Sequence, residues 1–227
     1  MSFLKILEQI ILTPLKLFFE LFFSWGCQLT GSPGWSIIFL SLIMNTLLLP
    51  LYKNADRIQM EEQALQKKMK KGLDHIKKTF RDDERFMMTQ TYYRQNNYKP
   101  IYVLRAMVPL MLEIPFFIAA YQFISSMTLL RQVSFGPIRN LGEPDQWLVI
   151  GSLSLNILPI LMTLINILSS LIYTKDAPTK TKVQLFAMAA VFLVLLYNSP
   201  SALVLYWTMN NLYSLVKNAI SFWLLPK

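Results

Sequence analysis

The sequence of 227 residues contains one cysteine, Cys27, and one histidine, His75. A single cysteine excludes an internal disulfide and any metal site built from cysteines. His75 lies in a lysine-rich segment, so a solvated side chain explains it better than a ligand or a catalytic base. The sequence also has no recognisable nucleophile–base set, metal cluster or phosphate-binding loop. We therefore expect neither an enzyme nor a bound cofactor.

Charged residues are scarce as well. They make up 15% of the chain, against about a quarter in an ordinary soluble protein, whereas 54% of the residues are hydrophobic. Long apolar segments alternate with short basic ones, and about 20 apolar residues are needed to cross the roughly 30 Å hydrocarbon core of a bilayer. We predict an all-α polytopic membrane protein with five spans, at about residues 35–52, 101–127, 147–173, 183–198 and 201–224.

The first 30 residues form a separate segment. Their apolar run is interrupted by Pro14 and by four charged residues whose spacing puts them on one helical face (Lys5, Glu8, Lys16 and Glu20). A secretory signal peptide has an uninterrupted apolar region and a small-residue cleavage site, and neither is found here. We predict an amphipathic helix lying in the membrane interface over residues 1–30, with a membrane span as the alternative.

Basic residues between the apolar segments predict the orientation of the chain. Lysines and arginines are concentrated in residues 53–100 and in the short segment 174–182, whereas the two in 128–146 are offset by two acids. By the positive-inside rule, both basic segments face the cytoplasm, and so does the C-terminus. Because topology accounts for the net charge of +9, we expect no specific nucleic-acid partner.

The basic segment 53–99 is itself expected to fold. Apolar residues recur at helical spacing from Ile58 to Phe80, and the sequence RDDE (81–84) offers a turn and an N-cap, Asp82 or Asp83, for a second helix. The two helices would form a cytoplasmic hairpin. It is either a solvated spacer or a docking site for a ribosome, a targeting factor or lipid headgroups, through its lysines (Lys67, Lys68, Lys70, Lys71, Lys77 and Lys78).

Several polar side chains fall inside the predicted spans, where each must find a partner or line a wet cavity. At about 1.5 Å of rise per residue, five of them lie in the middle third of the bilayer (Asn45, Glu113, Asn156, Asn210 and Asn211). A helix-to-helix hydrogen bond explains any one of them, but four spans with a polar group at similar depth favour a shared hydrophilic cavity. Arg105, nearer the cytoplasm, is either an interfacial anchor or a residue at the mouth of the cavity.

Four fragments, in this order, resemble the family of YidC, mitochondrial oxidase-assembly and chloroplast Alb insertases over about residues 31–224. They are GWSIIFLSLIMNTLLLPLYK, PLMLEIPFFIAAYQFI, LRQVSFGPIRNL and NSPSALVLYWTMNNLYSLVKN. The resemblance implies an insertase core over 31–227, with five helices around a hydrophilic groove closed to the outside. It implies that Tyr206 joins the polar residues of that groove. It also implies a bacterial inner-membrane protein that inserts clients without nucleotide hydrolysis.

The implied clients are nascent or newly made membrane proteins, whose polar segments enter the groove while their apolar segments pass into the lipid bilayer. The resemblance further implies a ribosome, signal recognition receptor or Sec translocon as partners of the hairpin. Bacterial members usually have an arginine at the position of Asn45 and a glutamine at that of Glu113, so this groove would be neutral or acidic. That difference leaves open a dedicated assembly partner of one membrane complex that inserts nothing itself. A transporter using Glu113 is disfavoured, because no inverted repeat is evident.

Overall fold

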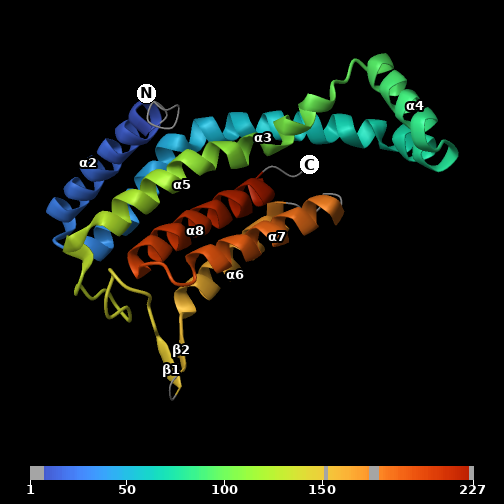
Figure 1. Ribbon diagram of the computed structural model, residues 1–227. Helices are drawn as coiled ribbons and strands as arrows, with labels where there is room; N and C mark the ends of the chain where they lie inside the picture. The colour runs from blue at the N-terminus through green and yellow to red at the C-terminus, as the bar shows by residue number, and fades with distance from the viewer. Residues whose placement is uncertain (1–7, 151–152, 174–178, 225–227) are drawn as a thin grey trace. The chain divides into compact units, whose positions relative to one another are not determined.

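The computed structural model describes residues 8–150, 153–173 and 179–224, and most of these are helical (Figure 1). The chain divides into two compact units, one comprising Met1–Leu47 with Phe117–Lys227 and the other Leu48–Phe116. Two long helices, α3 (Pro33–Thr79) and α5 (Val108–Ser126), contribute residues to both units. Among the described residues, two helical segments are long and apolar enough to cross a membrane, Glu8–Thr30 and Pro33–Thr79.

The first of these segments consists of a π-helical turn, Glu8–Leu12, followed by α2 (Thr13–Thr30). Gly31 ends α2 in the left-handed conformation, with φ 65°, and its N–H donates to the Cys27 carbonyl at 2.9 Å. Phe19 is fully buried, with its ring against Phe123 of α5 and Tyr206. The predicted interfacial position of this helix stays a prediction, and residues 1–7, with Lys5, lie outside the described part of the chain.

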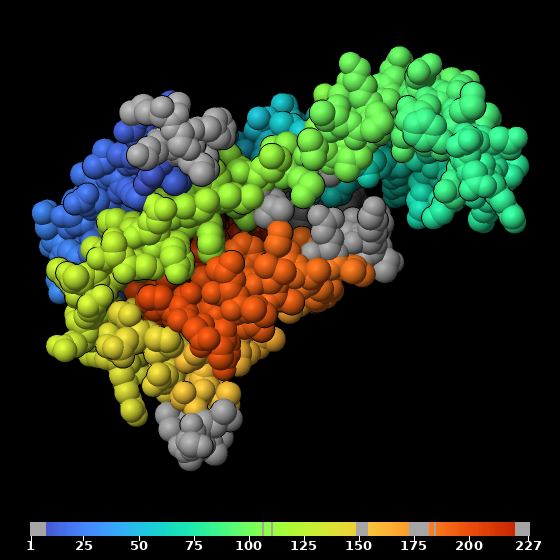
Figure 2. Space-filling view, in the orientation of Figure 1, coloured from blue at the N-terminus to red at the C-terminus, as the bar shows by residue number. Residues whose placement is uncertain are grey.

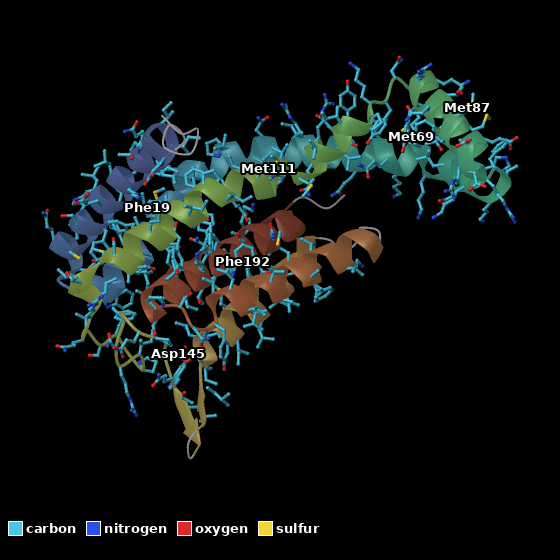
Figure 3. The ribbon with its side chains drawn as sticks, viewed as in Figure 1. Phe19, Met69, Met87, Met111, Asp145 and Phe192 are labelled. Carbon is cyan, nitrogen blue, oxygen red and sulfur yellow. The ribbon has the colours of Figure 1, made fainter. Side chains whose placement is uncertain are left out.

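Three apolar helices, α6 (Ile157–Tyr173), α7 (Thr179–Leu196) and α8 (Ser201–Leu224), pack side by side in the first unit (Figure 1). The contact between α6 and α8 is the most extensive, and Leu196 of α7 and Leu203 and Val204 of α8 are buried. On α7, Phe192 packs against Trp207 of α8, with ring centroids 5.8 Å apart (Figure 3). The bounds of α8 coincide with the predicted last span.

The predicted span 147–173 is wrong in its first ten residues. There the chain forms a two-stranded antiparallel hairpin, β1 (Leu148–Ile150) and β2 (Leu153–Leu155), and α6 begins only at Ile157. The start of α6 is fixed by Asp145, whose carboxylate accepts hydrogen bonds from the first two N–H groups of the helix, at 2.8 and 3.3 Å. A carboxylate at this end of a helix also interacts favourably with the helix dipole.

In the second unit, α3 continues without interruption through Pro50 to Thr79, so the first helix of the predicted hairpin extends directly from the first span. After a turn, the chain forms α4 (Asp82–Gln95), a 3-10 helix (Pro100–Met107) and the start of α5. The predicted N-cap is wrong. Arg81 occupies that position without a side-chain bond, and Asp82 and Asp83 lie in the first turn, where their negative charge interacts favourably with the helix dipole.

The hairpin of α3 and α4 has specific internal contacts. A Cβ at Gly72 would collide with the ring and hydroxyl of Tyr92, so the glycine permits the close approach of the two helices. Earlier on α3, the carboxylate of Glu62 is 2% exposed and accepts hydrogen bonds from the Tyr98 hydroxyl at 2.6 Å and the Gln66 amide at 2.8 Å. All six lysines of the predicted docking surface are exposed. Met69 and Met87 mark the two helices in Figure 3.

Candidate functional site

A cluster of uncharged polar side chains joins α3 to α8 within the first unit. The Asn45 amide nitrogen Nδ2 donates to Asn210 Oδ1 at 2.6 Å and to the Ser41 carbonyl, one turn earlier, at 2.8 Å. The Ser41 hydroxyl also donates to Asn210 Oδ1, at 2.6 Å. Asn210 therefore accepts two hydrogen bonds from α3 on one oxygen. The structure brings together two of the predicted site residues, Asn45 and Asn210, and adds Ser41.

The cluster is partly open, because Asn45 and Asn210 are half-buried and the neighbouring Thr46 is exposed. The Thr46 hydroxyl lies 3.5 Å from that of Tyr213, one turn along α8 from the cluster. Pro50 has no N–H, so the Thr46 carbonyl lacks its ordinary helical donor and is left as an acceptor beside the cluster. Tyr206, one turn before Asn210 on α8, is 4% exposed, and its ring packs against those of Phe19 and Trp207 on the apolar side of the cluster.

Asn211, the next residue of α8, points to a different helix. Its Oδ1 accepts the Asn166 amide of α6 at 3.0 Å, and its own amide lies 3.5 Å from the Met162 carbonyl. Two turns on, the Asn218 amide donates to the Ser169 hydroxyl at 3.1 Å. The two predicted asparagines thus belong to separate contacts, Asn210 to α3 and Asn211 to α6. Asn166 was not predicted, although an amide inside the apolar run of α6 is the same signal that drew attention to Asn45.

Asn156 belongs to a third group, at one end of the helices. It directly precedes α6, so its predicted position nine residues into a span is wrong, because the preceding residues are strand and not helix. Its Nδ2 donates to the Tyr197 carbonyl, in the turn between α7 and α8, at 2.8 Å, and its Oδ1 accepts the Gln146 N–H at 3.0 Å. Asn156 therefore ties the base of the β hairpin to the helix ends.

The loop before the hairpin is attached to the same end of the unit. The N–H groups of Ser201 and Ala202, at the start of α8, donate to the carbonyls of Glu143 and Leu141 at 2.7 and 2.9 Å. In Figure 2 this loop, coloured yellow, gathers at one end of the first unit. Figure 3 shows Asp145 at the junction between the loop and the hairpin.

Two predicted site residues lie in the second unit. The Arg105 guanidinium stacks over the Tyr102 ring, 3.9 Å from its centroid, and the side chain is exposed. Glu113 lies in α5, is half-buried and makes an interaction of its own. That Glu113 and Arg105 share a cavity with Asn45 stays a prediction.

The cluster around Asn45 supplies neutral hydrogen-bond donors and acceptors and no charge among the contacts described above. Amide and hydroxyl groups of this kind satisfy peptide or hydroxyl groups in an apolar environment, where an unpaired polar group costs several kcal/mol. They do not activate a nucleophile or transfer a proton. The chemistry that fits the cluster is solvation of a polar group inside an apolar helical unit.

Comparisons with known proteins cover nearly the whole chain. The sequence pattern of the "60Kd inner membrane protein" family matches residues 25–222. A "Membrane protein insertase YidC" from Aquifex aeolicus (strain VF5) is 32% identical over 213 residues, which is 92% of this chain and 38% of that protein. A protein of the same name from Endomicrobium trichonymphae is 27% identical over 194 residues, covering 84% of this chain and 36% of its own length. The chain thus spans little more than a third of these relatives.

A solved structure has the same fold. The crystal structure of an active YidC insertase, with its first transmembrane domain resolved, superposes with a TM-score of 0.56. The alignment covers 96% of this chain and 46% of that one, at 21% sequence identity. At this identity the likeness concerns the fold alone.

Proposed function

The chain belongs to the 60Kd inner membrane protein family, and from that premise we propose that it acts as a membrane protein insertase or chaperone. Polar segments of a client enter a hydrophilic groove within the membrane, while its apolar segments leave sideways into lipid, without nucleotide hydrolysis. The names of the relatives and the likeness in fold support this proposal. The observation that carries it in this chain is the half-open polar cluster of Ser41, Asn45 and Asn210 between α3 and α8.

Polar groups of a client lose water when they enter the bilayer, and the groove would replace part of that hydration. Asn45, Asn210 and Tyr206 form the floor of the groove in this proposal, and the exposed Thr46 lies beside it. For Glu113 and Arg105 the proposal rests on the family resemblance: Glu113 would add an acidic group, and Arg105 would lie at the mouth. Asn211 and Asn156 hold α8 and α6 in place and do not contact the client, since their partners are other helices and loops.

The proposal includes a preference among clients. An amide at Asn45 provides hydrogen bonds without positive charge, and in the proposed groove Glu113 would contribute an acid. A neutral or acidic groove does not attract acidic segments. We therefore propose that this protein favours clients whose translocated segments are neutral or basic.

In the membrane, we propose that α3, α5, α6, α7 and α8 form the five-helix core and that the α3–α4 hairpin and the C-terminus face the cytoplasm. The helix α2 lies in the membrane interface. The concentration of exposed lysines in the hairpin supports this orientation by the positive-inside rule. The hairpin would then present its lysines to a ribosome, a signal recognition receptor, the Sec translocon or anionic lipid.

The test is insertion by the purified full chain in liposomes, measured as protease protection of a short client. Asn45→Leu removes the amide of the cluster, and Asn166→Leu is the matched control, because Asn166 also donates its amide to an asparagine of α8. We expect Asn45→Leu to lose insertion and Asn166→Leu to keep it, at similar thermal stability. A chain that inserts no client above empty liposomes would contradict the insertase function itself.

One observation favours a second function. The Asn45 amide donates to Asn210, and the arginine that the family resemblance implies at position 45 is absent, as a purely structural contact would permit. The protein would then be an assembly partner of one membrane complex without inserting anything. Affinity purification separates the two functions. A single stoichiometric partner that co-purifies without ribosomes favours the assembly partner, and a range of newly made membrane proteins favours the insertase.

A further inference from the structure

We propose that the two strands of the β hairpin, Leu148–Ile150 and Leu153–Leu155, form a membrane-interface anchor that lies in the lipid headgroup layer at the N-terminal end of α6. This position is at the opposite end of the helices from Lys182, which is near the start of α7. The proposal concerns the lipid contacts of the chain and does not depend on the insertase function.

The first observation is the length of α6. Its 17 residues, at about 1.5 Å each, span about 26 Å, which is less than the roughly 30 Å hydrocarbon core of a bilayer. The uncharged sequence is longer than the helix, because no charged residue occurs between Asp145 and Lys175. The uncharged chain therefore continues past the N-terminal end of α6, where the short helix brings the base of the hairpin to the boundary between hydrocarbon and headgroups.

The second observation is the exposure of large apolar side chains at the base of the hairpin. Trp147 is 46% exposed and Leu148 is 44% exposed. Exposed leucines continue along α6, where Leu164 and Leu168 are 59% and 51% exposed, as expected for a surface that faces lipid acyl chains. A tryptophan at the end of such a surface is typical of the membrane–water interface.

The third observation is the way the hairpin is fixed. Asp145 caps α6 on one side of the hairpin, and Asn156 bonds to the α7–α8 turn on the other, so its base stays at the level of the helix ends (Figure 3). Only three residue pairs join the strands, from Leu148–Leu155 to Ile150–Leu153. An isolated two-stranded hairpin is marginal in water, and its open edges are excluded from the hydrocarbon core. The interface, which offers both apolar contact and hydrogen-bonding partners, meets both conditions.

Lipid is a better partner for this surface than another protein. The hairpin has no charged side chain that would select a partner, and strands of three residues give few edge hydrogen bonds for an added strand. The lipid-facing residues of α6 are continuous with it along the chain. The chemistry recognised is therefore that of a lipid headgroup layer.

The experiment places an environment-sensitive fluorophore on Leu148→Cys in a Cys27→Ser background, with the full chain in lipid nanodiscs. Quenching is measured with iodide in the water and with nitroxide lipids labelled near the headgroup or deep in the acyl chain. Ser134→Cys, exposed in the preceding loop, is the aqueous control, and Leu164→Cys on α6 is the acyl-chain control. We expect the label at 148 to show blue-shifted emission. Iodide should quench its fluorescence little, and the shallow nitroxide should quench it more than the deep one.

Two results would overturn the proposal. Iodide quenching at 148 equal to that at 134 would place the hairpin in water, and protection from both iodide and nitroxide would place it against protein. A second measurement needs no label: brominated lipids should quench the native chain, and Trp147→Phe should remove a shallow component of that quenching. If the quenching profile does not change with Trp147→Phe, the hairpin is not in the interface.

Discussion

Asn210 and Asn211 are adjacent and chemically identical, so leucine at each position separates a role in the groove from a role in helix packing. Asn210→Leu removes the acceptor of two hydrogen bonds from α3, those of Ser41 and Asn45. Asn211→Leu removes two hydrogen bonds with α6, one of 3.0 Å with Asn166 and a longer one of 3.5 Å with the Met162 carbonyl. Hydrogen bonds between membrane helices average about 0.6 kcal/mol. The expected losses are therefore about 1.2 kcal/mol for Asn210→Leu and about 0.6 to 1.2 kcal/mol for Asn211→Leu.

The two variants should therefore differ little in stability and strongly in function. If the cluster stabilises a client segment by about 1.4 kcal/mol, Asn210→Leu lowers insertion roughly tenfold, and Asn211→Leu leaves it close to that of the native chain. Stability is measured by reversible unfolding in bicelles, and insertion by protease protection in proteoliposomes. A double-mutant cycle of Asn45→Leu with Asn210→Leu should give a coupling of about 0.6 kcal/mol, and at most about 1.7 kcal/mol.

The outcome that would refute this reasoning is a loss of insertion that follows stability in both variants. Asn210 would then be a packing contact of the same kind as Asn211, and the polar cluster would have no part in handling clients. A coupling near zero between Asn45 and Asn210 would contradict the hydrogen bond itself.

Three further predictions concern contacts away from the cluster. Burial, and then the bond to Glu62, raise the pKa of Tyr98 to about 12, above its ordinary value of 10.0. The stability that Tyr98 contributes should therefore persist below pH 10 and be lost between pH 10 and 12, and this loss should vanish in Tyr98→Phe melting curves. Gly34→Ala should destabilise the chain by about 1–3 kcal/mol, because the new Cβ overlaps the Phe135 side chain. Adding Phe135→Ala should restore the melting temperature in the double variant. If the melting temperature is not restored, this clash is not the cause. Asp145→Ala should cost about 0.5–2 kcal/mol and increase hydrogen exchange in the first turn of α6, whereas unchanged exchange would show that the cap is dispensable.

The helices were the most predictable part of the fold. Apolar length predicts a helix over residues 201–224, and these are the bounds of α8. The same reasoning failed at residues 147–156, where strands and helix have equally apolar sequences. Two polar residues, Asp145 and Asn156, mark the two ends of the hairpin. Their role is evident only from their hydrogen bonds to backbone groups elsewhere in the chain, which the sequence does not reveal.

For the candidate site, the sequence predicts how deep each polar residue lies along its helix, but not which neighbouring helix it contacts. Sequence position gives the height of an asparagine along a helix axis, and it places Asn210 and Asn211 at nearly the same level. Their partners depend on which helices pack against α8, which one sequence does not state. Glu62 shows the same limit. Within a highly charged segment it reads as a solvated residue, yet Tyr98, 36 residues later in the chain, returns to bury it.

The adjacent asparagines of α8 also bear on how the helices can separate. Successive residues of an α-helix point about 100° apart, so Asn210 and Asn211 hold α8 at a fixed rotation about its axis, one from α3 and one from α6. Rolling α8 in either direction would stretch at least one of these bonds. On the α6 side, Asn218 and Ser169 add a second bond two turns away, at 3.1 Å. On the α3 side, the further bond described, between the hydroxyls of Thr46 and Tyr213, is longer, at 3.5 Å, and lies one turn from Asn210. We expect any opening at this site to be one-sided, with α3 moving away and α6 and α8 remaining together as one rigid pair.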